Sequence, residues 1–335
     1  MSRSLLHSLT LLSLACHTAS AALNLRLISF NIRYATTSLF DNERPWQERA
    51  PLVINQLQHE VWPVASSVTD NSTSTSTTTT KSYTSAFICL QEVLHAQLID
   101  ILAGLNNVPS NTSNVPTSGP KWAHIGVGRD DGKTKGEYSP IIYPIGNFDL
   151  LHAETVWLSP TPDKPSKGWD AGSIRILTIG VFRHKATQQT IIATNTHLDN
   201  AGTKSRLESV GIILDRLQRA QKQWSTGNGT SSVPMFLTGD FNSLTTQEAY
   251  QAMVASGYMR DLRDQVDAKS WYGNVNTFTG FVNAKEDQKR IDYIWLGPKE
   301  EKRWTVAGYA VLPNVFDGGV YLSDHRAVVG DVVLS

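Results

Sequence analysis

Carboxylate, amide and imidazole side chains stand at the ends of apolar segments throughout this 335-residue sequence. In "PMFLTGDFNS" (234–243), for example, an apolar run leads to Asp240 and Asn242. Alternate side chains of an extended chain share a face, so Asp240 and Asn242 point the same way while Phe241 points away. Gly-Asp and Asn-Ser are also common turn residues. This stretch alone therefore does not distinguish a functional site from a turn.

The same pattern recurs in five other segments. Their terminal polar residues are Asn31 in "RLISFN", Glu92 in "FICLQE", Asn195 and His197 in "IIATNTH", Asp292 in "DYIWL", and Asp324 and His325 before "RAVVGDVVL". One or two such ends can arise by chance. Six of them favour a single site that is assembled across a sheet.

The residue types indicate the chemistry of this site. Carboxylate and amide oxygens without thiolates suit a hard divalent cation, Mg²⁺ or Mn²⁺, better than structural zinc. Histidines among acids suit general acid–base catalysis and the stabilisation of phosphate charge. The sequence has neither a Gly-rich phosphate loop nor a serine in a nucleophile elbow. Water activated near a metal is then the expected nucleophile, and phosphoester hydrolysis the expected reaction.

Strands and helices roughly alternate along the chain and position these residues. Apolar runs predict strands at 23–32, 86–93, 150–159, 175–184, 190–199, 234–242, 291–297 and 326–335. Helical periodicity appears at 49–62, 95–105, 204–224 and 246–257. Consecutive strands mixed with α/β units favour a sheet-containing sandwich covered by helices over a doubly wound sheet.

Seven pieces of the sequence together resemble the endonuclease/exonuclease/phosphatase superfamily, which includes pancreatic deoxyribonuclease. They are "SFNIRY", "CLQEV", "GEYSPIIY", "NTHLD", "TGDFNS", "RIDYIW" and "SDHRAV", in the family's order from residue 29 to 328. The resemblance implies an α/β fold: a four-layer sandwich of two mixed β-sheets packed face to face and flanked by helices. It also implies a divalent-metal-dependent hydrolase of phosphoric ester bonds, with in-line attack of an activated water.

The resemblance further implies roles for individual residues. Glu92 is the expected principal metal ligand, with Asn31 beside it and Asp324 as a further metal ligand or supporting acid. Asp240 is expected to position or deprotonate the water. Asn242 is expected to hold the water or a phosphate oxygen. His325, oriented by Asp292, is expected to contact the scissile phosphate, and His197 to face it from the other side and assist the leaving group.

Four further residues are candidates for substrate binding. Arg175 opens a strand and either clamps phosphate or is a surface arginine. Asn195 shares a strand end with His197. Tyr138 in "GEYSPIIY" either reaches the site or packs as an aromatic, and Phe281 belongs to a segment that lines the cleft in relatives but has core packing as its alternative. Asp199 and Arg206 either support the site or cap the helix that follows.

The N-terminal segment, 1–21, has the features of a secretory signal peptide. Arg3 is a short positive region, 5–15 is apolar, and Ala19-Ser20-Ala21 is a small-x-small cleavage site. We expect a secreted protein without stable membrane insertion, with one domain over 22–335. Polar insertions are expected at 66–85, 106–120 and 225–233, each with a glycosylation acceptor: Asn71, Asn111 and Asn228. Cys89 is then the one cysteine outside the signal peptide, and we expect it to be buried.

Composition limits the partners. The 30 basic and 30 acidic residues give a formal charge of zero, which is not typical of a protein that tracks long polyanions. We expect a monomer whose substrate is nucleic acid, a nucleotide, an inositol phosphate or a phospholipid head group. The alternative is a non-catalytic secreted binding or effector protein that retains the fold. Loss of a metal ligand or of the base would mark that alternative, and each of the seven pieces keeps its polar residues.

Overall fold

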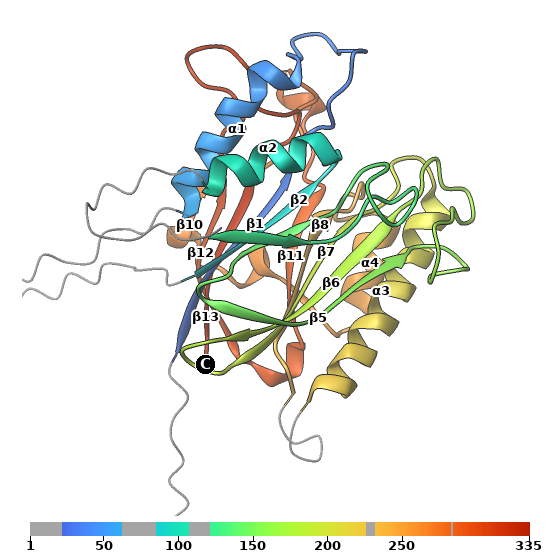
Figure 1. Cartoon of the computed structure of the whole chain (residues 1–335), viewed down its shortest axis with the longest axis vertical. Helices are drawn as coiled ribbons and strands as arrows, with labels where there is room; N and C mark the ends of the chain where they lie inside the picture. The colour runs from blue at the N-terminus through green and yellow to red at the C-terminus, as the bar shows by residue number, and fades with distance from the viewer. Residues whose placement is uncertain (1–21, 62–84, 107–120, 226–231, 283) are drawn as a thin grey trace, which may run out of the picture.

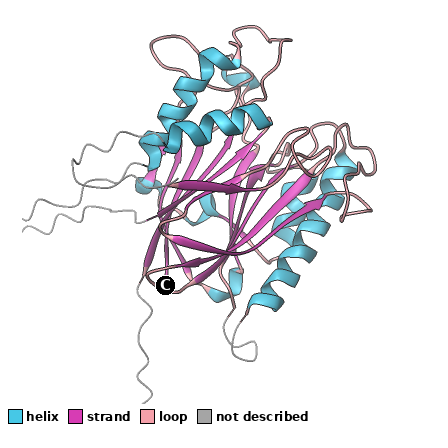
Figure 2. Ribbon diagram, in the orientation of Figure 1, coloured by secondary structure: helices cyan, strands magenta, loops and turns pink. Residues whose placement is uncertain are grey.

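The computed structural model describes residues 22–61, 85–106, 121–225, 232–282 and 284–335. Two β-sheets form the middle of the molecule (Figure 1, Figure 2). The first has the order β10 (Trp271–Gly273), β12 (Trp304–Val311), β13 (Val328–Leu334), β1 (Leu23–Asn31), β2 (Ser85–Gln91), β4 (Ile141–Pro144), β3 (Trp122–Ile125). The second has the order β5 (Phe148–Trp157), β6 (Ile176–His184), β7 (Thr190–His197), β8 (Met235–Asp240), β11 (Asp292–Gly297), β9 (Arg260–Asp261).

Both sheets are mixed, and their pairing brings strand ends together. β1 is parallel to β2 and β7 is parallel to β8, whereas β13 and β11 run antiparallel to these pairs. In the second sheet, Asp240 at the end of β8 stands opposite His197 at the end of β7. It also stands opposite Asp292 at the start of β11. One edge of the sheet therefore collects three of the predicted catalytic side chains.

Apolar side chains fill the space between the sheets. Phe87 of β2 packs against Phe182 of β6 and Phe236 of β8, with ring centroids 5.1 and 5.3 Å apart. Along β1, Leu27 faces this central core while Ile28 faces the helices on the outside. Complete burial of each such side chain contributes about 1.5–3 kcal/mol. The core thus fixes how the two sheets lie against each other and where their strand ends meet.

Helices cover the two outer faces and complete a four-layer sandwich. α1 (Trp46–Val61) and α2 (His95–Asn106) pack on the first sheet, and α3 (Thr203–Trp224) and α4 (Glu248–Ala255) pack on the second (Figure 1). Val53 and Leu57, one turn apart on α1, are completely buried. The fold class and the four helices expected from the sequence are confirmed, each helix within about one turn at its ends.

The first sheet contains one long strand that the sequence did not predict. The residues of β12 carry a bulge between Val306 and Gly308 in the pairing with β13, and the bulge interrupts the alternation that marks a strand. Ser85, Asn106 and Ser225, assigned above to polar insertions, belong to β2, to α2 and to the end of α3. The rest of those insertions lies mostly, and the expected signal peptide wholly, outside the described residues.

Two smaller expectations concern burial and membranes. Cys89 is a free, completely buried thiol in the central core, and burial raises its pKa to about 12, so it behaves as a small apolar residue. Among the helices that the structure describes, none combines the length and the apolar character that a membrane crossing requires.

Candidate active site

The polar strand ends meet at one edge of the two sheets, and Asn31 links them. Its Nδ2 donates to Oε1 of Glu92 at 3.1 Å and to Oδ2 of Asp240 at 3.0 Å. Its Oδ1 accepts from the Arg33 amide at 3.0 Å. Asn31 thus bridges the first sheet to the second. In this arrangement its nitrogen orients two carboxylates, and the metal role expected of Asn31 stays a prediction.

Glu92 and Asn242 both follow a strand and both have left-handed backbone angles, with φ of 59° and 46°. Such a residue turns the chain sharply at the strand end, and non-glycine residues adopt it at a cost. Oε2 of Glu92 accepts from the Tyr34 amide at 3.2 Å. The Asn242 amide donates to Oδ1 of Asp240 at 2.8 Å. Hydrogen bonds to the Glu92 and Asp240 carboxylates therefore stabilise the chain around these turns.

Asp292 and His325 form a hydrogen-bonded pair, as expected. Nδ1 of His325 lies 2.9 Å from Oδ2 of Asp292, and its Nε2 lies 3.6 Å from Oδ2 of Asp240. Burial lowers the pKa of His325, but the charges of Asp292 and Asp240 outweigh it and hold the pKa well above the ordinary value. His325 is therefore an imidazolium near neutral pH. Asp292 accepts from Nδ1–H of His325, so the second proton of the imidazolium is on Nε2, the nitrogen nearer Asp240.

Asp240 is the carboxylate at the centre. It is 1% exposed, and its Oδ2 lies 3.4 Å from Nε2 of His197 on the side opposite His325. Burial, and after it the charge of Asp292, raises the pKa of Asp240 to about 7 against the opposing effect of His325. A carboxyl group that titrates near neutrality is suited to accept a proton from water.

His197 and Arg175 close the other side of the site. Nη1 of Arg175 lies 3.0 Å from Nδ1 of His197, and Nε of Arg175 donates to Oδ2 of Asp199 at 3.2 Å. Arg175 is buried, which excludes the alternative of a surface arginine. Burial, and then the charges of Arg175 and Arg129, hold the pKa of His197 well below the ordinary value. His197 is therefore neutral.

Asp199 and Arg206 lie behind this pair. Asp199 accepts from the amides of Ala201 and Gly202, just before α3, and its hydrogen bond from Arg175 supports the site as well. Arg206 donates to the Asp199 carbonyl and pairs with Glu248, so it connects α3 to α4.

The carboxylates near Glu92 fit a divalent cation. Burial raises the pKa of Asp324, and the charge of Glu92 raises it further. Oδ1 of Asp292 is buried without a hydrogen-bond partner among the described residues. Mutual repulsion among oxygen donors is what a hard cation relieves. Asp240, Asp292 and His325 also place one possible ligand atom each within 4.8 Å of one another, but the His325–Asp292 hydrogen bond and the ion pair of His325 with Asp240 favour an acid–base group.

Three of the predicted substrate-binding residues do not reach the site. Asn195 lies opposite Thr238, two pairs deeper than His197, and its Nδ2 donates to the Leu90 and Pro140 carbonyls. It is completely buried and joins the sheets beneath the site.

The two aromatic candidates are core residues. Tyr138 is 3% exposed, and its hydroxyl donates to the Lys133 carbonyl and lies 3.0 Å from Nδ1 of His95. Phe281 is completely buried against Tyr321. In its place Phe278, half-buried, meets the ring of His325 edge-on, with centroids 5.0 Å apart.

Two residues that the sequence did not single out belong to the site. Glu137 accepts from Arg129, with distances of 2.7 and 2.8 Å to the two terminal nitrogens, and its Oε2 lies 3.8 Å from Nδ1 of His197. Burial, and then the charge of Glu92, raises the pKa of Glu137 to about 6. Glu137 is the acid of the motif "GEYSPIIY", and its place in that motif is a sequence signal for a site residue. Arg129 lies in a loop without a pattern of its own.

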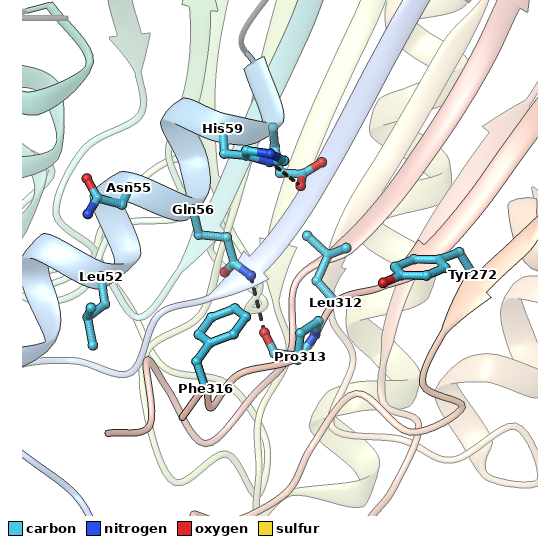
Figure 3. A pocket seen from close by; sticks show the side chains of 9 residues that line it. Leu52, Asn55, Gln56, His59, Tyr272, Leu312, Pro313 and Phe316 are labelled. Carbon is cyan, nitrogen blue, oxygen red and sulfur yellow. Dashed lines mark hydrogen bonds and ion pairs between the residues drawn. The ribbon is translucent and has the colours of Figure 1, made fainter. Parts of the chain in front are cut away.

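A separate cavity of about 540 Å³ lies between α1, β10 and the segment after β12 (Figure 3). Gln56 and His59 of α1 line it together with Tyr272, Leu312 and Phe316, and Nε2 of Gln56 donates to the Pro313 carbonyl at 3.2 Å. None of the strand-end polar residues described above lines this cavity. It is therefore distinct from the candidate active site.

Comparison with known proteins supports the same interpretation. The profile of the Endonuclease/Exonuclease/phosphatase family matches residues 28–325. A protein of that family from Bacteroides thetaiotaomicron shares 29% identity, with a TM-score of 0.74 over 95% of this chain and 97% of that chain. The mannosyl-6-phosphatase of Bacteroides thetaiotaomicron VPI-5482 shares 29% identity, with a TM-score of 0.72 over 92% of this chain and 99% of that chain.

More distant relatives share less. The human Nocturnin catalytic domain has 17% identity and a TM-score of 0.61 over 93% of this chain and 95% of that chain, which is a likeness of fold alone. The CCR4-Not complex 3'-5'-exoribonuclease subunit Ccr4 of Yarrowia lipolytica is 27% identical over 156 residues. That alignment spans 36% of this chain and only 22% of the yeast protein.

Proposed function

Because the chain belongs to the endonuclease/exonuclease/phosphatase family, whose members are hydrolases of phosphoester bonds, we propose that it hydrolyses its phosphoester by in-line attack of a water that Asp240 activates. One observation carries the proposal. The Asp240 carboxylate, with a pKa of about 7, lies between a neutral imidazole, His197, and an imidazolium, His325. A base and a cationic donor are thus side by side where the strand ends meet.

The residues divide the work as follows. Asp240 takes the proton of the attacking water, and Asn242, whose amide holds Oδ1 of Asp240, keeps the base oriented. His325 directs Nε2–H at the developing negative charge on the phosphate, and Asp292 fixes its tautomer from the other nitrogen. His197 faces the phosphate from the opposite side. Fixed donors of this kind are effective because they need no reorganisation during the reaction.

The reaction as proposed depends on a divalent cation, Mg²⁺ or Mn²⁺. Glu92 and Asp324 would hold it, because both offer carboxylate oxygens at the same edge and the charge of Glu92 raises the pKa of Asp324. A bound cation would neutralise phosphate charge. Asn31 keeps Glu92 and Asp240 in their relative positions through its amide nitrogen.

A phosphomonoester on a sugar is the proposed substrate class. The support is the mannosyl-6-phosphatase relative, which is aligned over nearly the whole of both chains at 29% identity. The positive charges of Arg129 and Arg175, which lower the pKa of His197, suit an anion with the two charges of a terminal phosphate. We also propose that the protein is exported as a glycosylated monomer, on the basis of the N-terminal segment and the three glycosylation acceptors.

Phosphate release tests the proposal. The chain without its first 21 residues is incubated with Mg²⁺, Mn²⁺ or EDTA and with mannose 6-phosphate, p-nitrophenyl phosphate, bis-p-nitrophenyl phosphate or single-stranded RNA. We expect turnover of the monoesters in either metal and none in EDTA. Glu92→Gln should abolish turnover, whereas Glu208→Gln on the exposed face of α3 should not. Full activity in EDTA contradicts the metal requirement, and turnover of RNA alone contradicts the substrate class.

A further inference from the structure

The ring of His197 faces a hydrogen-bond donor on each side. Nη1 of Arg175 lies 3.0 Å from Nδ1, and Nδ2 of Asn242 lies 3.0 Å from Nε2. A neutral imidazole has one nitrogen that accepts and one that donates. The low pKa of His197 keeps the ring neutral, so only one of the two donors finds an acceptor. The surroundings of His197 therefore determine which of its two neutral tautomers is present.

Arg175 is the donor that cannot turn away from the His197 ring. Its Nε donates to Asp199, and its Nη2 donates to Oδ1 of Asn200 at 3.0 Å. Asp199 is in turn fixed by the amides of Gly172 and Gly202 at 2.9 and 2.8 Å. A guanidinium carries hydrogen on every nitrogen and does not lose its proton in proteins. With the group held on two of its nitrogens, Nη1–H has to point at Nδ1.

Asn242 has another acceptor, and Nε2 of His197 has another neighbour. Nδ2 of Asn242 also donates to the Leu198 carbonyl at 3.1 Å, and the Asn242 side chain is half-buried. Oδ2 of Asp240 lies 3.4 Å from Nε2 of His197. A lone pair on Nε2 would face this carboxylate, whereas a proton there would be attracted to it. The acid that favours the other tautomer, Glu137, is farther from the ring, with Oε2 at 3.8 Å from Nδ1.

We propose that Arg175 is a positioning residue that fixes His197 as the neutral tautomer with its proton on Nε2. Resting on the proposed function, this makes His197 a hydrogen-bond donor to a phosphate oxygen, and not a group that takes a proton from water. Asp199 and Asn200 hold the arginine in place. The proton transfer is thereby left to Asp240, and the two histidines serve as one neutral and one cationic donor.

Ring ¹⁵N chemical shifts of the histidines read the tautomer directly. We expect the Nε2–H pattern for His197 in the parent chain, assigned by its loss in His197→Gln. Arg175→Met removes the donor from Nδ1, so Asn242 can donate to Nε2 and Glu137 can accept from Nδ1. The ring should then change to the Nδ1–H pattern. Arg206→Met is the matched control, since it also removes a buried arginine that contacts Asp199 but does not touch His197.

Kinetics supplies the second readout. Arg175→Met should lower kcat by about 10²-fold, the range for losing one oriented donor, with a smaller effect on KM. An Nδ1–H or doubly protonated ring in the parent chain overturns the proposal, even if Arg175→Met does not fold. An unchanged tautomer in a folded Arg175→Met overturns it as well. If the parent chain hydrolyses no phosphoester, the proposed function fails, while the spectra still decide the role of Arg175.

Discussion

Asp240 has the surroundings that a general base for water attack requires. Burial and the charge of Asp292 raise its pKa to about 7, so the carboxylate gains a proton as the pH falls through neutrality. The base form is present above that pKa and lost below it. We therefore expect kcat/KM to rise with pH through about 7, and Asp240→Asn to lower kcat by about 10²–10⁴-fold.

The matched control for Asp240 is Asp215→Asn, on the solvent side of α3, where the carboxylate pairs with Arg219. It should keep the parental kcat and the parental pH profile. Stopped assays over a range of pH in saturating Mg²⁺ measure both quantities. Parental turnover in a folded Asp240→Asn variant would mean that another group activates the water.

Asp292 and His325 should behave as a unit. Asp292 contributes through the 2.9 Å contact to Nδ1 of His325, so removing either partner removes much of the same stabilisation. His325→Ala should cost at least as much turnover as Asp240→Asn, because it removes a cation where negative charge develops. The double variant with Asp292→Asn should be little worse than His325→Ala alone. A double-mutant cycle in kcat measures the coupling, and losses that simply multiply would separate the two residues.

Sequence patterns identified most of the residues at this edge but not their depth. Asn195 and His197 share a face of β7, yet Asn195 lies two pairs deeper and is enclosed between the sheets. Alternation gives the face of a side chain and not its distance from the rim. In "GEYSPIIY" we expected Tyr138 to reach the site. Tyr138 instead pairs with Val93 and points into the core, and the neighbouring Glu137 faces the site.

At the scale of elements, the segment from Gly128 to Glu137 is a closed loop that carries two site residues. The Arg129 amide donates to the Glu137 carbonyl at 3.1 Å, and Trp157 donates to the Arg129 carbonyl at 2.8 Å. Gly136 has a φ of 80°, and a Cβ there would lie 2.5 Å from Cγ of Asp130. The loop thus depends on glycine where the chain turns back toward Glu137.

Gly136→Ala should disturb this loop. The left-handed backbone costs a non-glycine residue about 1–2 kcal/mol, and the contact with Asp130 adds to that cost. We expect a lower free energy of unfolding and a lower kcat, since Glu137 and Arg129 shift together. Gly211→Ala is the control, because Gly211 lies in α3 with nothing within 4 Å of an added Cβ. It should stabilise the protein by up to about 1 kcal/mol. Denaturant titration compares the two, and equal stability of both variants would contradict the role of Gly136.

The four helices were predictable, whereas the bulged strand β12 and the shortest strands were not. The four helices follow from apolar residues that recur with helical spacing. β9 and β10 have two and three residues, too few to show any alternation, and the structure places them by pairing with neighbours. Their position depends on contacts between residues far apart in the chain, which no local pattern contains.

At the scale of the whole molecule, the fold determines where the site forms and leaves the substrate open. Parallel pairing of β1 with β2 and of β7 with β8 brings four carboxyl ends to one edge. The chain is similar in part of its sequence to an exoribonuclease subunit and in its whole fold to a mannosyl-6-phosphatase. Substrate choice therefore has to come from groups around the edge, such as Arg129, Glu137 and Phe278, and not from the sandwich itself.

The first strand sets a limit on how the chain can be processed on export. Leu23 is 1% exposed and pairs with Leu334 of β13, so the folded domain begins next to the expected cleavage site. Cleavage after Ala21 leaves β1 complete, whereas cleavage a few residues later would remove buried side chains from the core. We expect the protein in culture supernatant to begin at Ala22, with glycan on Asn71, Asn111 or Asn228. N-terminal sequencing and intact mass before and after glycosidase treatment measure this, with Ala19→Arg as a variant whose cleavage should fail. A protein that stays in the cell and begins at Met1 would show that the N-terminal segment does not direct export.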